Sequence, residues 1–135
     1  MKKLVFDSYA LIALFRGEKN AQEVKELLVT IANEEAEGYI TAVNAGEIYY
    51  MISRKSNSKN AKTAIAALLH MPLKIIEPSL QLCLDAAAIK AKFSLSYADA
   101  FAAALAISEK AILVTGDKEF ENLKNLSGFK VKYLS

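Results

Sequence analysis

Short apolar segments alternate with longer helical segments along the whole sequence, and this alternation restricts the possible folds more than any other feature. Strands are expected at residues 4–6, 39–41, 73–76, 111–115 and 129–134. Because a helical segment separates consecutive strands, neighbouring strands can form parallel units joined by right-handed crossovers. The sequence therefore predicts an α/β fold in which helices flank a central parallel sheet of about five short strands.

Several helix starts are expected from capping residues. In a capping box, a polar residue at the helix start and a Glu or similar acceptor three positions later satisfy each other's free N–H groups. Three pairs have this spacing: Asn20 with Glu23, Asn44 with Glu47, and Ser96 with Asp99. Ser79 is a further candidate cap, because serine is favoured at that position. These residues predict four of the helices.

Other residues predict where helices end. Gly38 is expected to break the second helix, and the polar run 54–60 is expected to form a turn. Pro72 is expected to end the helix that follows this turn, since proline cannot continue a helix. The apolar run 8–15 is interpreted as a short buried helix.

The helix expected after Ser79 carries apolar residues at helical spacing. They are Leu80, Leu84, Ala87 and Ala91, and they predict its buried face. The single cysteine, Cys83, is expected to be a small buried hydrophobic residue on this helix.

Length and composition exclude several classes of protein. The 135 residues correspond to one domain, for which we take the boundaries 1–135. A hydrophobic fraction of 53% excludes disorder, and one Cys with one His excludes zinc cages and disulfide scaffolds. Lys and Arg exceed Asp and Glu by only two, so any nucleic-acid contact must come from local patches. With no long apolar run, we expect a soluble cytoplasmic protein.

Four acids lie where the ends of strands meet the starts of helices: Asp7, Glu47, Asp99 and Asp117. In parallel sheets, ligands bind outside the carboxyl ends of the strands. Several carboxylates in one pocket repel each other unless a cation neutralises them, and Mg²⁺ prefers oxygen ligands. Each acid also has an ordinary structural interpretation, because acids are enriched at helix starts. Position alone therefore leaves both a metal site and a set of caps open.

The residues around these acids carry a resemblance. Four segments matter: LVFDS at 4–8, NAGEIYY at 44–50, SYADAFAAALA at 96–106 and LVTGDKEF at 113–120. In order and spacing they resemble the PIN-domain ribonucleases, most closely the small VapC-type toxins of toxin–antitoxin pairs. The match spans nearly the whole chain. It implies a three-layer PIN-like fold.

The resemblance also implies site residues, placed by position. Asp7, Glu47 and Asp99 would be the core metal-binding carboxylates, and Asp117 the fourth acid. Two pocket hydroxyls would come from Ser8 and Thr115. Two positions depart from the family pattern: Tyr9 stands where a small residue is common, and Glu119 where an aspartate is common.

The implied activity is that of a metal-dependent endoribonuclease. Mg²⁺, or alternatively Mn²⁺, would support hydrolysis of an RNA phosphodiester bond. By resemblance, the protein would form a homodimer and would be held inactive by a cognate antitoxin. The lone His70 is interpreted as a capping or surface residue rather than as an acid–base catalyst.

A locally basic stretch is a weak candidate for RNA binding. It consists of Arg54, Lys55, Lys59 and Lys62, with no acid between them. Such a stretch can hold phosphates, although a solvated turn explains it equally simply. Tyr49 and Tyr50 are candidates for base stacking, but consecutive helical residues point about 100° apart, so at least one is expected in the core.

Three other classes of protein are alternatives. A receiver domain requires an acceptor aspartate at the end of the third strand, where residues 76–78 read Ile-Glu-Pro. A haloacid-dehalogenase-type phosphatase requires a second aspartate two residues after the first, where Tyr9 stands. A PIN-like module for RNA binding or processing, without cleavage or a toxin role, remains open at this point.

Overall fold

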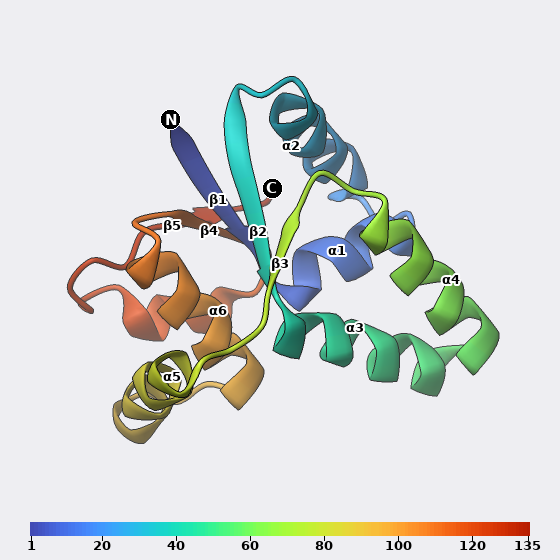
Figure 1. Ribbon diagram of the computed structural model, residues 1–135. Coiled ribbons are helices and arrows are strands. Elements are labelled where there is room, and N and C mark those ends of the chain that lie inside the picture. Colours follow the sequence, from blue (N-terminus) through green and yellow to red (C-terminus); the bar gives the residue numbers. More distant parts are fainter.

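The computed structural model describes residues 1–135, and strands and helices alternate along the chain (Figure 1). In chain order the elements are β1 (Lys2–Phe6), α1 (Ser8–Phe15), α2 (Ala21–Ala32), β2 (Ala36–Thr41), α3 (Ala42–Lys55), α4 (Ser58–Leu69), β3 (Lys74–Ile76), α5 (Leu80–Lys92), α6 (Tyr97–Ser108), β4 (Ile112–Thr115), the 3-10 helix η1 (Lys118–Leu123) and β5 (Val131–Tyr133).

The five strands form one sheet in the order β3-β2-β1-β4-β5, and every neighbouring pair is parallel. The predicted α/β class with a central parallel sheet of five short strands is therefore confirmed. β1 lies in the middle, with Leu4 opposite Gly38 of β2 and Ile112 of β4. This order brings the carboxyl ends of β1 and β4 side by side although they are far apart in sequence.

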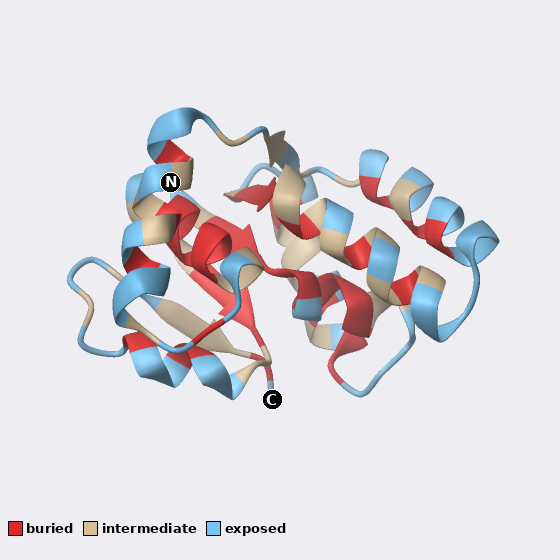
Figure 2. Ribbon diagram, turned by 90° about the horizontal axis from the view of Figure 1, so that it is seen from below, coloured by how far each residue is buried: buried red, intermediate tan, exposed pale blue.

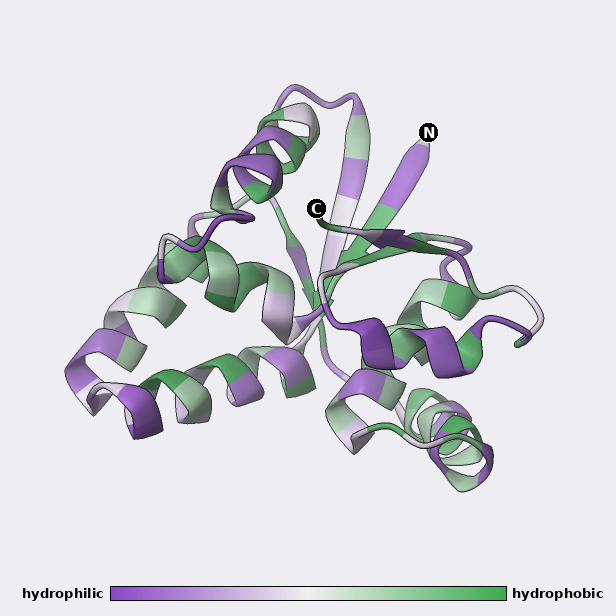
Figure 3. Ribbon diagram, turned by 180° about the vertical axis from the view of Figure 1, so that it is seen from behind, coloured by the Kyte–Doolittle hydropathy of each residue, from purple (hydrophilic) through white to green (hydrophobic).

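Helices cover both faces of the sheet. Alternate residues of β1 point to opposite sides, so that Leu4 and Phe6 belong to one buried cluster and Val5 to the other. The first cluster is covered by α1 to α4, and the second by α5, α6 and η1 (Figure 1). Figure 2 shows buried residues on the inner sides of the helices and exposed ones outside, and Figure 3 shows hydrophilic residues concentrated on the outer turns.

The capping box predicted at Ser96 is present in part, and the one at Asn20 is wrong. The Ser96 hydroxyl accepts a hydrogen bond from the Asp99 N–H at 3.1 Å, as a helix cap should. Asn20 stands at the start of α2 in a helical conformation, and its side chain caps nothing. Glu23 instead accepts from the Ser135 N–H at 3.0 Å and pairs with Lys132 at 3.2 Å.

The third predicted capping box, Asn44 with Glu47, is also wrong. α3 begins earlier, because Thr41 is its cap and accepts a hydrogen bond from the Asn44 N–H at 2.9 Å. Glu47 consequently lies beyond the first turn. The turn predicted at 54–60 is shorter than expected, since α3 continues to Lys55 and Asn57 caps α4.

Gly38 lies inside β2 and does not end α2, contrary to the prediction. The helix ends at Ala32, and the chain reverses through Glu34, whose φ is 62°. A Cβ atom at Gly38 would lie 2.5 Å from Ile31 Cδ1 and 2.6 Å from Leu73 Cδ2. A larger residue would displace these two side-chain ends, so glycine lets Ile31 of α2 and Leu73 pack closely on the strand.

The buried face of α5 differs from the predicted one. Leu82, Ala86 and Ile89 are buried, whereas Leu80 is 75% and Leu84 is 54% exposed. Ser79 does cap this helix, accepting from the Leu82 N–H at 3.1 Å. The cap was predicted correctly, but the neighbouring apolar residues gave the wrong face. Cys83 is half-buried and packs against the core cluster.

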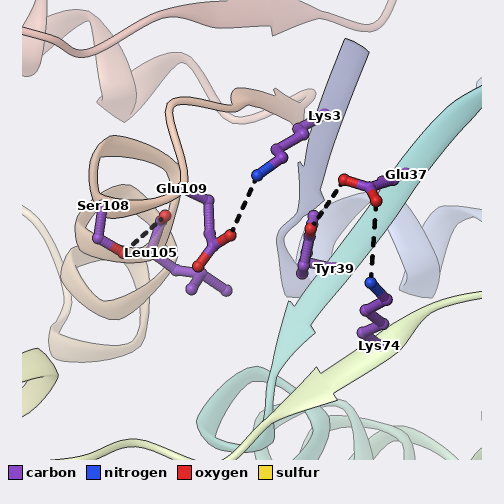
Figure 4. Close-up of polar contacts among 7 residues, drawn as sticks. All are labelled: Lys3, Glu37, Tyr39, Lys74, Leu105, Ser108 and Glu109. Carbon is purple, nitrogen blue, oxygen red and sulfur yellow. Dashed lines mark hydrogen bonds and ion pairs between the residues drawn. The ribbon is translucent and has the colours of Figure 1, made fainter. Parts of the chain in front are cut away.

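Polar contacts join elements at the opposite edge of the sheet from the carboxyl ends of the strands (Figure 4). Glu37 of β2 accepts a hydrogen bond from the Tyr39 hydroxyl at 3.1 Å and pairs with Lys74 of β3 at 3.9 Å. Lys3 of β1 pairs with Glu109 after α6 at 3.6 Å. These contacts lie at partly exposed positions, so each contributes little stability.

No helix is long and apolar enough to cross a membrane.

Candidate functional site

An acidic pocket opens at the edge of the sheet where β1 and β4 end and where α1, α3 and α6 carry their amino-terminal halves. Its volume is about 410 Å³. The residues that line it are Ser8, Tyr9, Ile12, Arg16, Glu18, Glu47, Met51, Lys55, Ser96, Asp99, Asp117 and Glu119. Three of the four predicted acids therefore line one pocket, and the fourth lies beside it.

Asp7 is buried next to the acidic pocket, with only 1% of its surface exposed. Its Oδ1 accepts a hydrogen bond from the Ala10 N–H at 2.9 Å, which caps α1, and its Oδ2 accepts from the Thr115 hydroxyl at 2.5 Å. Burial raises the pKa of Asp7 from 3.8 to about 7, while these hydrogen bonds lower it and the charges of Asp99 and Asp117 raise it. Asp7 is thus both a helix cap and a carboxyl group that ionises with difficulty.

Asp99 lines the pocket from the first turn of α6. Burial raises the pKa of Asp99 from 3.8 to about 7, and the neighbouring charges of Asp117 and Glu47 raise it further. Two carboxyl groups with raised pKa values therefore lie together at this edge. Carboxyl groups with raised pKa values are frequent at functional sites, because burial and like charges there shift pKa values to suit the chemistry.

Asp99, Asp117 and Glu119 each place a carboxylate oxygen within 4.8 Å of the others. Asp117 reaches this position because it follows β4 and caps η1, where its Oδ1 accepts from the Glu119 N–H at 2.9 Å. Thr115 fixes the turn, since its hydroxyl oxygen accepts from the Asp117 N–H at 2.9 Å. Glu119, which departs from the family pattern, belongs to this cluster.

Glu47 lines the same pocket from α3. The hydroxyl of Tyr50 donates a hydrogen bond to Glu47 Oε2 at 3.4 Å, one turn along the helix. The Arg54 guanidinium lies 6.0 Å from the centre of the Tyr50 ring. Tyr50 is exposed, whereas Tyr49 is half-buried and packs against the core, so the prediction that at least one of the two belongs to the core is confirmed.

Asn44 is a structural residue whose role the sequence did not predict. Its side chain is fully buried and donates hydrogen bonds to Ser8 Oγ at 3.1 Å and to the Ala98 carbonyl oxygen at 3.3 Å. Its Oδ1 accepts from the Thr41 hydroxyl at 2.5 Å. Asn44 therefore connects the first turns of α1, α3 and α6, the three helices that line the pocket. The asparagine was visible in the sequence only as a cap.

Two cations reach the acidic pocket, Lys55 and Arg16. Lys55 belongs to the predicted basic stretch, whereas Arg54, Lys59 and Lys62 do not line the pocket. Arg16 was missed, because it lies after α1 without any local motif; its Nε is 3.6 Å from Glu18 Oε2. His70 ends α4 and is exposed, with Nδ1 2.8 Å from the Ala66 carbonyl oxygen, as its capping interpretation predicted.

A larger groove of about 480 Å³ adjoins the acidic pocket. It runs between α1, α3 and α4, and more than half of its lining residues are hydrophobic. Ile12, Arg16, Met51 and Lys55 line both cavities. The groove is thus continuous with the acidic pocket.

The acidic pocket suits a hard divalent cation. Its potential ligands are carboxylate and hydroxyl oxygens, with no histidine or cysteine, and this donor set favours Mg²⁺ or Mn²⁺ over zinc. The raised pKa values of Asp7 and Asp99 have mutual repulsion among their causes, which a cation would relieve. The residues therefore fit a metal ion.

The five-stranded parallel sheet and the carboxylates clustered at the carboxyl ends of its strands define an α/β protein with an acidic pocket. The chain belongs to the PIN domain family, whose model matches residues 4–126. This match confirms the predicted family, and the domain is therefore of a nuclease type.

Solved structures share this fold. A chain of VapBC2 from Rickettsia felis, crystallised with a promoter DNA fragment, has a TM-score of 0.75 at 16% identity, and the match covers 98% of this chain and 99% of that one. VapC20 of Mycobacterium tuberculosis, a toxin that cleaves the sarcin-ricin loop, has a TM-score of 0.74 at 17% identity, with 90% and 95% covered. DNA-bound VapBC from Salmonella typhimurium has a TM-score of 0.75 at 15% identity, with both chains fully covered at 100%. No curated protein sequence matches the chain.

Proposed function

We propose that residues 1–135 act as one PIN domain that hydrolyses RNA phosphodiester bonds in the presence of Mg²⁺ or Mn²⁺. The observation that supports this proposal is the convergence of Asp99, Asp117 and Glu119 within 4.8 Å, beside the buried carboxyl group of Asp7. A group of acids that costs this much desolvation and repulsion is explained by a cation that binds there.

In this proposal Asp7, Glu47, Asp99 and Asp117 are the metal-binding and catalytic carboxylates, and Glu119 is added to them by its position. When bound, the metal ion would polarise the phosphate and lower the pKa of a coordinated water. Asp7 holds its carboxyl group in one orientation through its bonds to Ala10 and Thr115. Ser8 also lines the pocket, and its hydroxyl is bonded to Asn44.

Lys55 and Arg16 have a complementary role. Both are exposed cations on the lining of an otherwise acidic pocket. They are suited to hold the phosphates on either side of the bond to be cleaved, because cationic side chains contribute most of the affinity for nucleic-acid backbones. Arg54, Lys59 and Lys62 lie farther from the pocket lining and are left with a minor role.

We further propose that the protein is the toxin of a toxin–antitoxin pair, acting in the cytoplasm as a homodimer. The support is the fold shared with VapC20, described as a toxin, and with chains of VapBC complexes. The cognate antitoxin would be a protein partner that blocks the acidic pocket. The adjoining apolar groove offers it a surface.

The test is cleavage of a mixed cellular RNA pool by the purified chain. The reaction is run with Mg²⁺, with Mn²⁺ and with EDTA, and in parallel with Asp7→Asn and Asp99→Asn. Asp85→Asn is the matched control, because Asp85 is a carboxylate on α5 that only accepts a hydrogen bond from Gln81. Circular dichroism establishes that each variant is folded.

Discrete products that require the metal and Asp7 and Asp99, but not Asp85, support the proposal. The fragment ends then identify the RNA target. If folded protein binds RNA without cutting it in either metal, the nuclease is rejected in favour of an RNA-binding or RNA-processing module. If the two site variants cut as well as wild type, the assigned site residues are rejected.

A further inference from the structure

Tyr9 lies at the acidic pocket in an unusual setting for an aromatic residue. Its side chain lines the pocket together with Asp99 and Asp117, and 40% of its surface is exposed. It forms no hydrogen bond within the chain and no contact with another aromatic ring or with a cation. Two other exposed tyrosines of this region are already engaged: Tyr50 by Glu47 and Arg54, and Tyr97 by the ring of Phe101.

The Tyr9 ring is held against the main chain of Gly116. A Cβ atom at this glycine would lie 2.2 Å from Cε1 of the ring and 2.9 Å from both Cδ1 and Cζ. Gly116 does not have a positive φ, so its backbone conformation is available to other residues. The glycine is therefore needed for the close approach of the ring, which lies between the strand end at Thr115 and the acid at Asp117.

A partly exposed aromatic ring beside a pocket proposed to bind RNA offers a stacking surface to the substrate. A phosphate is not attracted by the ring face, which carries partial negative charge. A nucleobase does stack on such a ring, and the interaction tolerates any base because every base has a π-face. The base must be unpaired, since its faces are covered by neighbours inside a duplex.

We propose that Tyr9 is a specificity-determining residue that stacks one unpaired nucleobase next to the phosphate to be cleaved. The inference rests on the proposed ribonuclease function and deepens it: the substrate is RNA with an unstacked nucleotide at the cleavage position, in a loop or a single strand. Gly116 is the positioning residue, since it lets the ring lie where the base arrives.

The experiment uses the absence of tryptophan from this chain. Tyr9→Trp gives a single tryptophan, which is excited selectively over the remaining tyrosines. The variant is mixed in a stopped-flow instrument with a short single-stranded RNA and Mg²⁺, so that quenching is read before turnover. The same RNA with an abasic nucleotide at each position in turn, and the same RNA in a duplex, are the comparisons. Leu84→Trp, on the exposed face of α5, is the matched control.

We expect quenching by the single strand that is lost at one abasic position and in the duplex, and no quenching of the Leu84 control. In cleavage assays, Tyr9→Leu should raise KM about 5- to 150-fold, the range of one stacking contact, with kcat less affected. Tyr9→Phe keeps the ring and should raise KM less than Tyr9→Leu does.

Absence of quenching, quenching that ignores every abasic position, or an unchanged KM for Tyr9→Leu would overturn the proposal. The two proposals fail separately. If base-dependent quenching occurs but no RNA is cut, the stacking site stands and the nuclease does not; if Tyr9→Leu cuts with wild-type KM, the nuclease stands and the stacking site does not.

Discussion

The side-chain amide of Asn44 donates a hydrogen bond to the hydroxyl oxygen of Ser8, which lies 36 residues earlier in the sequence, at a distance of 3.1 Å. The Ser8 hydroxyl in turn donates to the Asn44 carbonyl oxygen at 3.2 Å. This reciprocal contact is buried, and Ser8 directly follows Asp7, the cap of α1. It fixes the start of α1 against α3, and so fixes two walls of the acidic pocket relative to each other.

Asn44→Ala should therefore lower the free energy of unfolding by about 2 kcal/mol or more, because it leaves several buried polar groups without partners. Urea unfolding of purified protein measures this loss. Asn60→Ala is the matched control, since Asn60 makes its contacts on the exposed side of α4, and it should change stability by less than about 1 kcal/mol. Equal losses in both variants would contradict the assigned role of Asn44.

The stability of the metal-free protein should fall as the pH rises from about 4 to about 7. The Asp7 carboxyl ionises near 3.8 when unfolded, whereas burial raises its pKa to about 7 in the fold. Between these values the folded chain holds more protons than the unfolded chain, so deprotonation favours unfolding. Asp99 changes in the same direction. The stabilisation by the protonated carboxyl group is complete below pH 3.8 and is lost as the pH rises past about 7.

Unfolding in urea and EDTA across this pH range measures the effect. Asp7→Asn cannot ionise, so its stability should depend less on pH, and Asp85→Asn should keep the wild-type dependence. Added Mg²⁺ should restore stability to the wild-type protein above pH 7. An identical pH dependence in Asp7→Asn and wild type would refute the raised pKa.

Thr115→Val should raise the pKa of Asp7 still further. It removes the hydroxyl that donates to Asp7 Oδ2, and that hydrogen bond favours the charged carboxylate. It also leaves the Asp117 N–H without its acceptor. The titration of the Asp7 carboxyl carbon, followed by NMR, reports the change directly, and Thr115→Ser should keep the wild-type value. A Val variant that titrates like wild type would show that the hydroxyl has no such effect.

Lys55→Gln should weaken RNA binding and reduce its salt dependence. One phosphate contact on a single strand contributes a slope of about 0.7 in log K against log salt concentration. Fluorescence anisotropy over a salt series, in EDTA to prevent cleavage, measures this slope. Lys25→Gln, an exposed lysine on α2, should leave it unchanged. If both variants lose the same amount, binding depends on total charge and not on the pocket.

The strands and most helices could be predicted because local patterns fix them. The α1 helix over 8–15 is confirmed, because a nearly continuous apolar segment follows a strand and a cap and must be buried. The capping boxes were predicted less well. Glu23 has the right spacing from Asn20, but its carboxylate is used by Lys132 and Ser135, which arrive from the far end of the chain. Local spacing cannot report such a competitor.

For the candidate site, too, the features set by local sequence were predicted, and those set by packing were not. The acids were found because each stands beside a strand end or a helix start. The local sequence did not indicate how far each acid is buried: Asp7 is fully buried, whereas Glu119 is exposed. It also did not indicate that Arg16 joins the pocket from a loop. Those properties depend on how neighbouring strands and helices pack. The roles of the site residues stay predictions until the variants are measured.

The order of strands also has a consequence for the timing of synthesis. β1 is synthesised before its neighbour β4, which ends at Thr115 and is followed by Asp117 and Glu119. A growing chain therefore holds Asp7 without Asp117 and Glu119 until β4 and η1 have been made. If this pocket cleaves RNA, the nascent chain lacks part of its carboxylate cluster up to that point.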